Sequence, residues 1–180
     1  MTISLKVINL WHGPGAGGST TAAGLFNIMK VRGHKVELVT EVAKDLTWEH
    51  SWKTMENQLL LLGLQDQRLR RLDGQVEWAI TDSPLPLGIA YMTKEYQPWL
   101  ELAVWDAYDR YQNFDVLLDR TCQYRRDGRS QTHQEALGLD LVVGELWRDA
   151  WDEDADHAVR IEGGFAAPHQ IYEWIFKDHG

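Results

Sequence analysis

The segment at residues 11–21 constrains the fold of this chain most, because it links an apolar run to a helical one through a glycine-rich turn. Leu5–Leu10 has the sequence LKVINL, which is typical of a buried strand. Four of the six residues at 13–18 are glycines, and a helical stretch follows from Ser19 to Val31. Glycines let a backbone curl so that several N–H groups point inward, and the start of the next helix adds positive potential. This order favours an α/β fold.

The remainder of the chain continues the alternation of strands and helices. Further strands are predicted at Lys35–Thr40, Val76–Thr81, Phe114–Asp119 and His157–Ile161. Further helices are predicted at Trp52–Leu72, from the loop at Pro84 to about Tyr111 with an interruption near Pro98, at Gln134–Trp151 and at Pro168–Phe176. We therefore predict a three-layer α/β/α sandwich around a five-stranded, mainly parallel sheet. Because no repeat or linker interrupts the pattern, residues 1–180 are predicted to form a single domain.

Composition and charge limit the class of protein. Hydrophobic residues make up 44% of the chain and charged residues 25%, which is ordinary for a globular protein. No run approaches the roughly 18 apolar residues of a membrane helix, and the N-terminus lacks the pattern of a secretory signal. The single cysteine, Cys122, excludes an internal disulfide and a cysteine-clustered zinc site, so we expect a cytoplasmic protein without a membrane partner. The formal net charge of −9 disfavours broad binding to nucleic acid but leaves a local basic site open, and a homodimer is compatible with the sequence.

The glycine-rich turn lies close to the phosphate-loop pattern G-x-x-x-x-G-K-[ST] but lacks its lysine. In one register Gly17-Gly18-Ser19 replaces G-K-[ST], so that His12 stands for the first glycine and Gly18 for the lysine. In the other register Gly13 is the first glycine and Ser19 takes the place of the lysine. We prefer the first register, because the run Gly-Pro-Gly-Ala-Gly then aligns with common nucleotide-kinase loops. Loss of the lysine should lower affinity or rate unless another cation substitutes.

Three further segments accompany this turn at intervals along the chain. They are Val39–Asp45 with Trp48-Glu49, Thr81–Leu85 and Tyr124–Gln131. Together with His12–Thr21 they resemble bacteriophage P-loop kinases related to deoxynucleoside monophosphate kinases, and more distantly the kinase domain of the nicotinamide riboside kinase type. The segments match in order from residue 5 to about residue 151. The resemblance implies a P-loop kinase fold, ATP as donor, Mg²⁺ as cofactor, nucleotide substrates and, for a phage-encoded protein, the host cytoplasm.

The same resemblance implies that the glycine-rich turn binds the phosphates of ATP. The residues concerned are Gly13, Pro14, Gly15, Ala16, Gly17, Gly18, Ser19 and Thr20. Asp82 follows the third predicted strand and would act in catalysis by holding Mg²⁺ together with the hydroxyl of Ser19.

An acceptor site and a lid are implied as well. The acceptor contacts would come from the second strand's end and beyond it, at Glu41, Lys44, Trp48 and Arg120. Residues 120–133 resemble a lid, in which arginine forks would bind phosphate oxygens and exclude water. The catalytic arginines, which are also the candidates to replace the charge of the missing lysine, would be Arg125, Arg126 and Arg129.

These assignments predict transfer of the γ-phosphoryl group of ATP to a deoxynucleoside monophosphate. Two alternatives remain open: a kinase that acts on a modified base within phage DNA, and a nucleotide-binding protein that lost catalysis together with the lysine. A dinucleotide-binding loop also stays open, because Gly13, Gly15 and Gly18 match G-x-G-x-x-G and Glu41 follows the second strand. Zinc hydrolysis and a serine hydrolase are disfavoured, since the chain contains neither H-E-x-x-H nor G-x-S-x-G.

Overall fold

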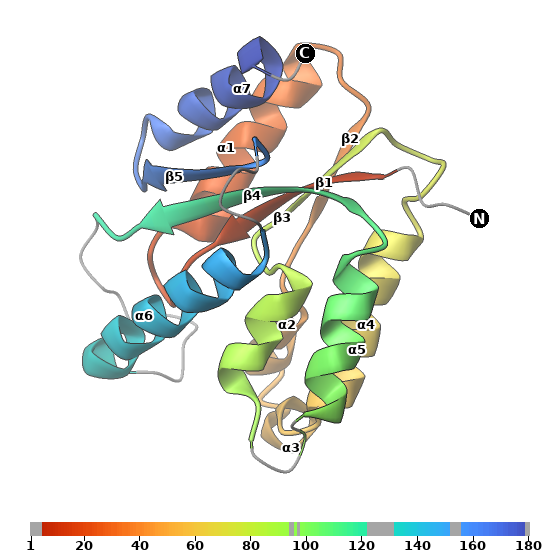
Figure 1. The fold of residues 1–180 in the computed structure, drawn as a ribbon, viewed down its shortest axis with the longest axis vertical. Coiled ribbons are helices and arrows are strands. Elements are labelled where there is room, and N and C mark those ends of the chain that lie inside the picture. The colour runs from red at the N-terminus through yellow and green to blue at the C-terminus, as the bar shows by residue number, and fades with distance from the viewer. Residues whose placement is uncertain (1–4, 94–95, 97, 122–131, 152–155, 179–180) are drawn as a thin grey trace.

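The computed structural model describes residues 5–93, 96, 98–121, 132–151 and 156–178, and its centre is a five-stranded sheet. The strands lie in the order β2-β3-β1-β4-β5, and every neighbouring pair is parallel (Figure 1). Their bounds are β1 Lys6–Trp11, β2 Val36–Val39, β3 Trp78–Thr81, β4 Gln112–Asp119 and β5 Ala158–Glu162. The predicted five-stranded parallel sheet is confirmed.

Helices cover both faces of this sheet, which confirms the predicted three-layer α/β/α architecture. Figure 1 shows α1 and α7 on one face and α4, α5 and α6 on the other. A 3-10 helix, η1, follows β3, and two short helices, α2 and α3, precede α4. The bounds are α1 Gly18–Val31, α2 Val42–Trp48, α3 Trp52–Met55, α4 Gln58–Arg70, η1 Leu85–Tyr91, α5 Trp99–Tyr108, α6 His133–Asp149 and α7 Ala167–Asp178.

The central strand β1 explains why the chain forms a sheet with two covered faces. Val7 and Trp11 pack into the hydrophobic core on one face, whereas Ile8 and Leu10 pack into the core on the other. A strand that is covered on both faces is mostly apolar, and four of the six residues of β1 are buried apolar side chains. Each such side chain contributes about 1.5–3 kcal/mol by its removal from water. The apolar run that begins the chain therefore forms the middle of the molecule.

The region between β2 and β3 differs from the sequence prediction. Trp52–Leu72 was expected to form one helix, which is wrong, because the structure divides it into α3 and α4. The break occurs at Asn57, whose side-chain oxygen accepts a hydrogen bond from Leu60 N (3.1 Å) and caps α4. The recurring leucines predict helical periodicity on both sides of this cap, but periodicity does not detect the cap itself.

The strand order places the glycine-rich turn in the middle of the sheet edge. Since β1 lies between β3 and β4, the turn after Trp11 lies between the carboxyl ends of these two strands, at Thr81 and Asp119. From β1 the chain continues to β2 on one side, and it reaches β4 on the other side only after β3. Open α/β sheets bind ligands in the crevice at such a switch point, outside the carboxyl ends of the strands.

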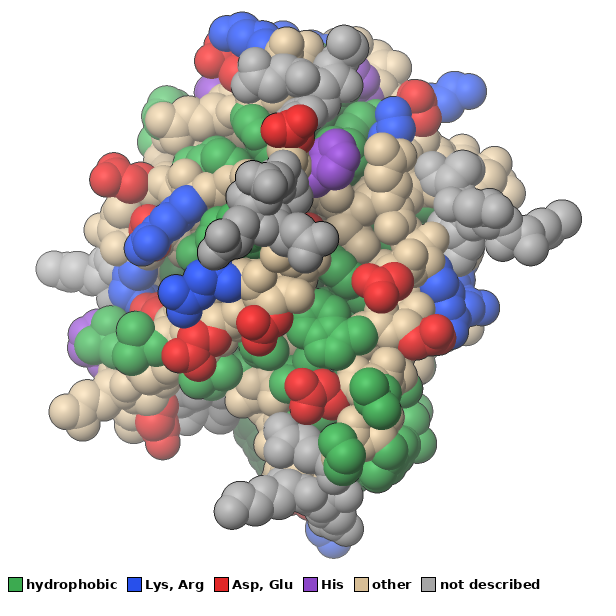
Figure 2. Space-filling view, viewed as in Figure 1, with side chains coloured by type: hydrophobic (Ala, Val, Ile, Leu, Met, Phe, Trp, Pro, Cys, Tyr) green, Lys and Arg blue, Asp and Glu red, His purple; other side chains and the backbone are tan. Residues whose placement is uncertain are grey.

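Two further observations concern the surface and the helices. On the face drawn in Figure 2, the lysine and arginine side chains of the described residues lie in small groups among acidic ones, without a continuous basic area. Along the described part of the chain, no helix is both long and apolar enough to span a bilayer.

Candidate active site

The turn after β1 wraps into a loop that leads directly into α1. Gly15 and Gly17 have φ angles of 78° and 97°, which lie in the left-handed region that glycine favours. Gly17 is the N-cap of α1, and the N–H of Ala16 donates to the carbonyl of Gly13 (3.2 Å). The first N–H groups of a 14-residue helix thus lie at the end of the loop. Such a helix start, with its positive dipole end, suits an anion.

Ser19 and Asp82 meet beside this loop. The Ser19 hydroxyl donates to Asp82 Oδ2 at 2.6 Å, which joins the first turn of α1 to the end of β3. Asp82 is only 4% exposed, and its Oδ1 atom has no hydrogen-bond partner among the described residues. A buried carboxylate oxygen without a partner is costly unless a ligand completes it.

This pair fits a magnesium ion. A carboxylate and a hydroxyl are oxygen donors of the kind that Mg²⁺ prefers, and the ion usually keeps several waters and takes other ligands from substrate phosphates. Within the described residues no group of three or more His, Cys, Asp or Glu side chains could hold a metal by itself. That result is compatible with Mg²⁺, which is commonly bound by one or two protein groups.

His12 occupies the space beside Gly18. Its Nε2 atom lies 2.9 Å from the carbonyl oxygen of Asp82, and its Nδ1 atom lies 3.0 Å from that of Gly13. A Cβ atom added to Gly18 would lie 1.8 Å from Nε2 of His12, so a side chain cannot start there while the imidazole keeps its position. In the preferred register, residue 18 is the lysine position. The imidazole therefore closes the lysine position of the loop.

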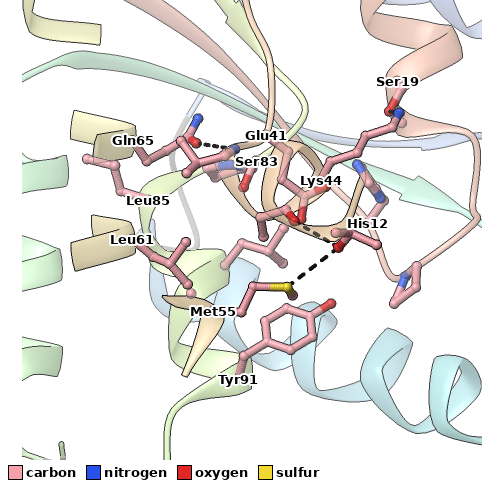
Figure 3. Close-up of a pocket in the computed structure, with 18 of the residues that line it drawn as sticks. His12, Ser19, Glu41, Lys44, Met55, Leu61, Gln65, Ser83, Leu85 and Tyr91 are labelled. Carbon is pink, nitrogen blue, oxygen red and sulfur yellow. Dashed lines mark hydrogen bonds between the residues drawn. The ribbon is translucent and has the colours of Figure 1, made fainter. Parts of the chain in front are cut away.

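Lys44 approaches the loop from outside it. It belongs to α2, and its ammonium group donates to Ser19 Oγ at 3.3 Å. Figure 3 shows its side chain extending from α2 toward Ser19. The structure thus brings Lys44, predicted as an acceptor contact, to the end of the site that the glycine loop forms.

Arg120 holds the loop from the opposite side. Its guanidinium donates to the carbonyl of Pro14 (2.8 Å) and to both carboxylate oxygens of Asp140 (2.8 and 2.9 Å). The side chain is 11% exposed, and a Cβ atom at Gly13 would lie 1.9 Å from Asp140 Oδ1. Arg120 does not line the cavity described next, although the sequence assigned it to the acceptor.

A cavity of about 410 Å³ extends from the loop into the space between α2, α4 and η1. One end is polar, with Ser19, Glu41 and Lys44, whereas the other end is largely apolar (Figure 3). Trp48 lies at its border and is 63% exposed. The apolar residues that line it include Met55, Leu61, Leu62, Leu85, Leu87, Tyr91, Met92 and Val104. Both the volume and the mixture of linings suit a small organic molecule with a charged end.

Gln65 of α4 fixes the segment that carries Glu41 and Lys44. Its Oε1 atom accepts from Val42 N (3.0 Å), and its Nε2 donates to the carbonyl of Thr40 (3.3 Å). Gln65 is only 6% exposed, so these two bonds are made away from water. The start of α2 is therefore held in place by a buried amide rather than by a capping side chain.

The fold has a counterpart of known structure. No protein-family model matches the sequence, and no curated protein is significantly similar to it in sequence. A structure of deoxyadenosine kinase from M. mycoides with bound dATP superimposes with a TM-score of 0.58 at 15% sequence identity, over 96% of this chain and 99% of that one. The chain shares the fold of that kinase. At 15% identity this similarity establishes the fold alone, so any activity must be argued from the residues of the site.

The predicted lid, residues 120–133, lies mostly outside the described residues. Arg125, Arg126 and Arg129 belong to residues 122–131, which the structure does not describe. The segment rejoins the described chain at Thr132, which caps α6: its hydroxyl accepts from Glu135 N (3.3 Å), and Thr132 N donates back to the Glu135 carboxylate (2.6 Å).

Sequence reasoning missed His12 as a part of the site. It also missed the apolar residues that η1 and α3 contribute to the cavity. A signal for His12 was available, because the loop departs from the phosphate-loop pattern at residues 12 and 18 together. In the structure the imidazole of His12 fills the space that a side chain at residue 18 would need, so the two differences from the pattern are connected.

Asp115 is a buried carboxyl group outside the cavity. It accepts hydrogen bonds from Trp11 Nε1 and from the Tyr108 hydroxyl, each at 2.6 Å. Burial raises the pKa of Asp115 to about 6, although these hydrogen bonds act in the opposite direction. Burial also raises the pKa of Tyr108, and the nearby charge of Asp115 adds to that shift. This group belongs to the hydrophobic core and affects stability rather than the site.

Proposed function

We propose that the protein is a P-loop phosphotransferase that moves the γ-phosphoryl group of ATP to a deoxynucleoside monophosphate. The observation that carries the proposal is the pairing of Ser19 with a buried Asp82 whose second oxygen is unsatisfied among the described residues, beside a glycine loop and a cavity. Phosphoryl transfer asks a protein mainly to position two reactants and to neutralise charge, and these features serve both tasks.

The donor's phosphates would bind in the loop. The backbone N–H groups of the loop and of the first turn of α1 would bind these phosphates, in the manner of phosphate loops on other strand–helix turns. Ser19 and Asp82 would hold Mg²⁺, which would offset the negative charge of the phosphates. Asp82 keeps the Ser19 hydroxyl oriented toward this position by their 2.6 Å hydrogen bond.

The acceptor would occupy the cavity. Its apolar end, with Leu61, Leu85 and Tyr91, is suited to a base, while Glu41 and Lys44 lie at the end nearer the loop. Trp48 at the border adds a partly exposed aromatic surface on which a base could stack. A molecule bound in this way directs its polar end toward the donor, which is the arrangement that transfer requires.

Arg125, Arg126 and Arg129 would act from the lid. Guanidinium forks bind phosphate oxygens bidentately, and a segment that closes over the reactants excludes the water that would otherwise hydrolyse ATP. Arg120, at the start of this segment, would hold the loop through Pro14 rather than contact the acceptor.

A second candidate acceptor is a deoxynucleoside. Among the described residues that line the cavity, the side chains with a basic group are His12 and Lys44, and no arginine is present. A monophosphate adds about −2 charge, and proteins usually meet it with arginine. A neutral nucleoside hydroxyl would need no such partner. A modified base within DNA and binding without turnover remain the other two alternatives.

An assay of ADP formation with a panel of acceptors tests the proposal. Purified protein is given MgATP with each deoxynucleoside monophosphate, each deoxynucleoside or duplex DNA that carries a hydroxymethylated base, and a reaction without acceptor measures hydrolysis. Turnover with monophosphates supports the main proposal, and turnover with only one of the other classes selects that alternative. Calorimetry that detects no ATP or ADP binding in the presence of Mg²⁺ would overturn the proposal as a whole.

A further inference from the structure

The phosphate loop has no ammonium group of its own. Residues 12–20 contain no lysine or arginine, and residue 18 is closed to a side chain by the imidazole of His12. Triphosphate binding brings several negative charges into this loop, so a cation close to it would stabilise the bound state. The cation must then reach the loop from another element.

Lys44 of α2 reaches the loop from outside it. Its ammonium donates to Ser19 Oγ at 3.3 Å, and Ser19 Oγ in turn donates to Asp82. The Ser19 hydroxyl thus connects Lys44 to Asp82, the carboxylate that we assign to Mg²⁺ binding. An ammonium group has three donors, and one bond to Ser19 leaves two for phosphate oxygens.

The neighbouring residues hold α2 in a position that directs Lys44 to the loop. Arg68 of α4 pairs with Asp45 (2.5 Å) and donates to the carbonyl of Thr40 (2.9 Å). The Asp45 carboxylate, which is adjacent to Lys44 in sequence, is therefore engaged by Arg68. Together with the buried bonds of Gln65 to the start of α2, this pairing fixes the helix from the side of α4.

We propose that Lys44 supplies the ammonium group that the phosphate loop lacks and contacts the terminal phosphates of the donor. This inference rests on the proposed function, because it assumes that a nucleoside triphosphate binds the loop. It assigns Lys44 to the donor instead of the acceptor. It also differs from the expectation that the lid arginines replace the missing charge.

The first part of the test compares nucleotides that differ in phosphate number. Calorimetry with Mg²⁺ measures the dissociation constants of ATP, ADP and AMP for the wild type, Lys44→Ala, Lys44→Arg and Lys53→Ala. Lys53 is an exposed lysine of α3 outside the cavity, so its variant controls for the change in net charge. Because Lys44→Ala removes a charge-assisted hydrogen bond, we expect the dissociation constant of ATP to rise about 10- to 100-fold in this variant. AMP binding should stay within about twofold, Lys44→Arg should keep part of the affinity, and Lys53→Ala should match the wild type.

The second part of the test introduces a lysine at residue 18, the usual lysine position of a phosphate loop, in place of Lys44. In a Lys44→Ala background, His12→Gly with Gly18→Lys opens residue 18 and places an ammonium there, which should recover most of the lost ATP affinity. Thermal melting of each variant separates weak binding from unfolding. Equal ATP affinity of Lys44→Ala and the wild type overturns the inference, and so does an equal loss for ATP and AMP or a folded triple variant without recovery. A wild type that binds no ATP overturns the proposed function itself, which a failure confined to Lys44 does not.

Discussion

The imidazole of His12 and the missing side chain of Gly18 occupy one space. A Cβ atom at residue 18 would lie 1.8 Å from His12 Nε2, which itself lies 2.9 Å from the carbonyl of Asp82. A single substitution that restores the usual phosphate-loop residue at only one of these two positions should therefore destabilise the loop. A lysine at 18 displaces the imidazole, and a glycine at 12 leaves its place empty.

This relationship predicts non-additive substitutions. Gly18→Lys alone should lower the free energy of unfolding by about 1–3 kcal/mol, because the side chain forces His12 out of its contacts. Combining it with His12→Gly should remove most of that cost, so the double variant is more stable than the sum of the two single changes. Urea unfolding of the four proteins measures the coupling. Additive losses would contradict it, and Gly63→Lys, at a position in α4 where a Cβ meets no atom within 4 Å, serves as the control.

Asp82 is predicted to make nucleotide binding depend on magnesium. In the wild type, ATP should bind at least tenfold more tightly with Mg²⁺ than with a chelator, because Asp82 Oδ1 is buried and free to ligate the ion. Asp82→Asn should remove most of this difference while the Ser19 contact persists. Asp149→Asn, a matched change at the exposed end of α6, should leave it intact. A magnesium effect of the same size in Asp82→Asn would exclude the assignment.

Arg120 is predicted to act through the loop. Its ion pair with Asp140 is mostly buried, so Arg120→Ala should cost about 1–3 kcal/mol of stability and weaken ATP binding by releasing Pro14. Arg160 makes a similar two-bonded pair with Asp119, but its side chain is 65% exposed, and Arg160→Ala should cost less than about 1 kcal/mol. Denaturant unfolding and calorimetry compare the two. If Arg120→Ala instead raises only the KM of the acceptor, its assignment to the acceptor site is correct.

Asp115 is predicted to make stability fall as the pH rises from about 4 to about 6. Its pKa is raised from 3.8 to about 6 in the folded protein, so in this interval the folded state binds more protons than the unfolded one. The destabilisation is absent below pH 4, grows through the interval and is constant above it, at about 3 kcal/mol. Asp115→Asn lacks this titration. The stability of the variant minus that of the wild type should therefore increase from pH 4 to pH 6 by a similar amount in urea unfolding, and a flat difference would contradict the assignment.

The sequence predicts the sheet well because its signal is local. Strand β1 is mostly apolar, and the turn after it requires glycine at Gly15 and Gly17, where the structure has positive φ angles. The helical region after β2 is predicted less well. The leucine spacing does not reveal the local cap that Asn57 forms with Leu60 N, and the start of α2 is fixed by a bond to Gln65 of α4. The leucine spacing in this region is compatible with one helix or with two.

The site is predictable in its residue types but not in its contacts. Ser19, Asp82 and Lys44 can be selected from the sequence because they follow strands at one sheet edge. The exchange between His12 and Gly18 joins residues that are close in sequence, yet it becomes visible only when the imidazole is seen to fill the empty position. The approach of Lys44 to Ser19 spans 25 residues and depends on the direction of α2, which no sequence period specifies.

Helix α2 carries Lys44 at the loop and Thr47 and Trp48 in the wall of the cavity. One short helix thus contributes to both the proposed donor site and the proposed acceptor site. A molecule that shifts this helix when it enters one site changes the fit of the other, and thermodynamic linkage requires the effect to be mutual: each ligand alters the affinity of its counterpart by the same factor. With a lysine in the loop itself, donor recognition would be independent of this helix, whereas with Lys44 in that role we expect the binding of donor and acceptor to be energetically coupled.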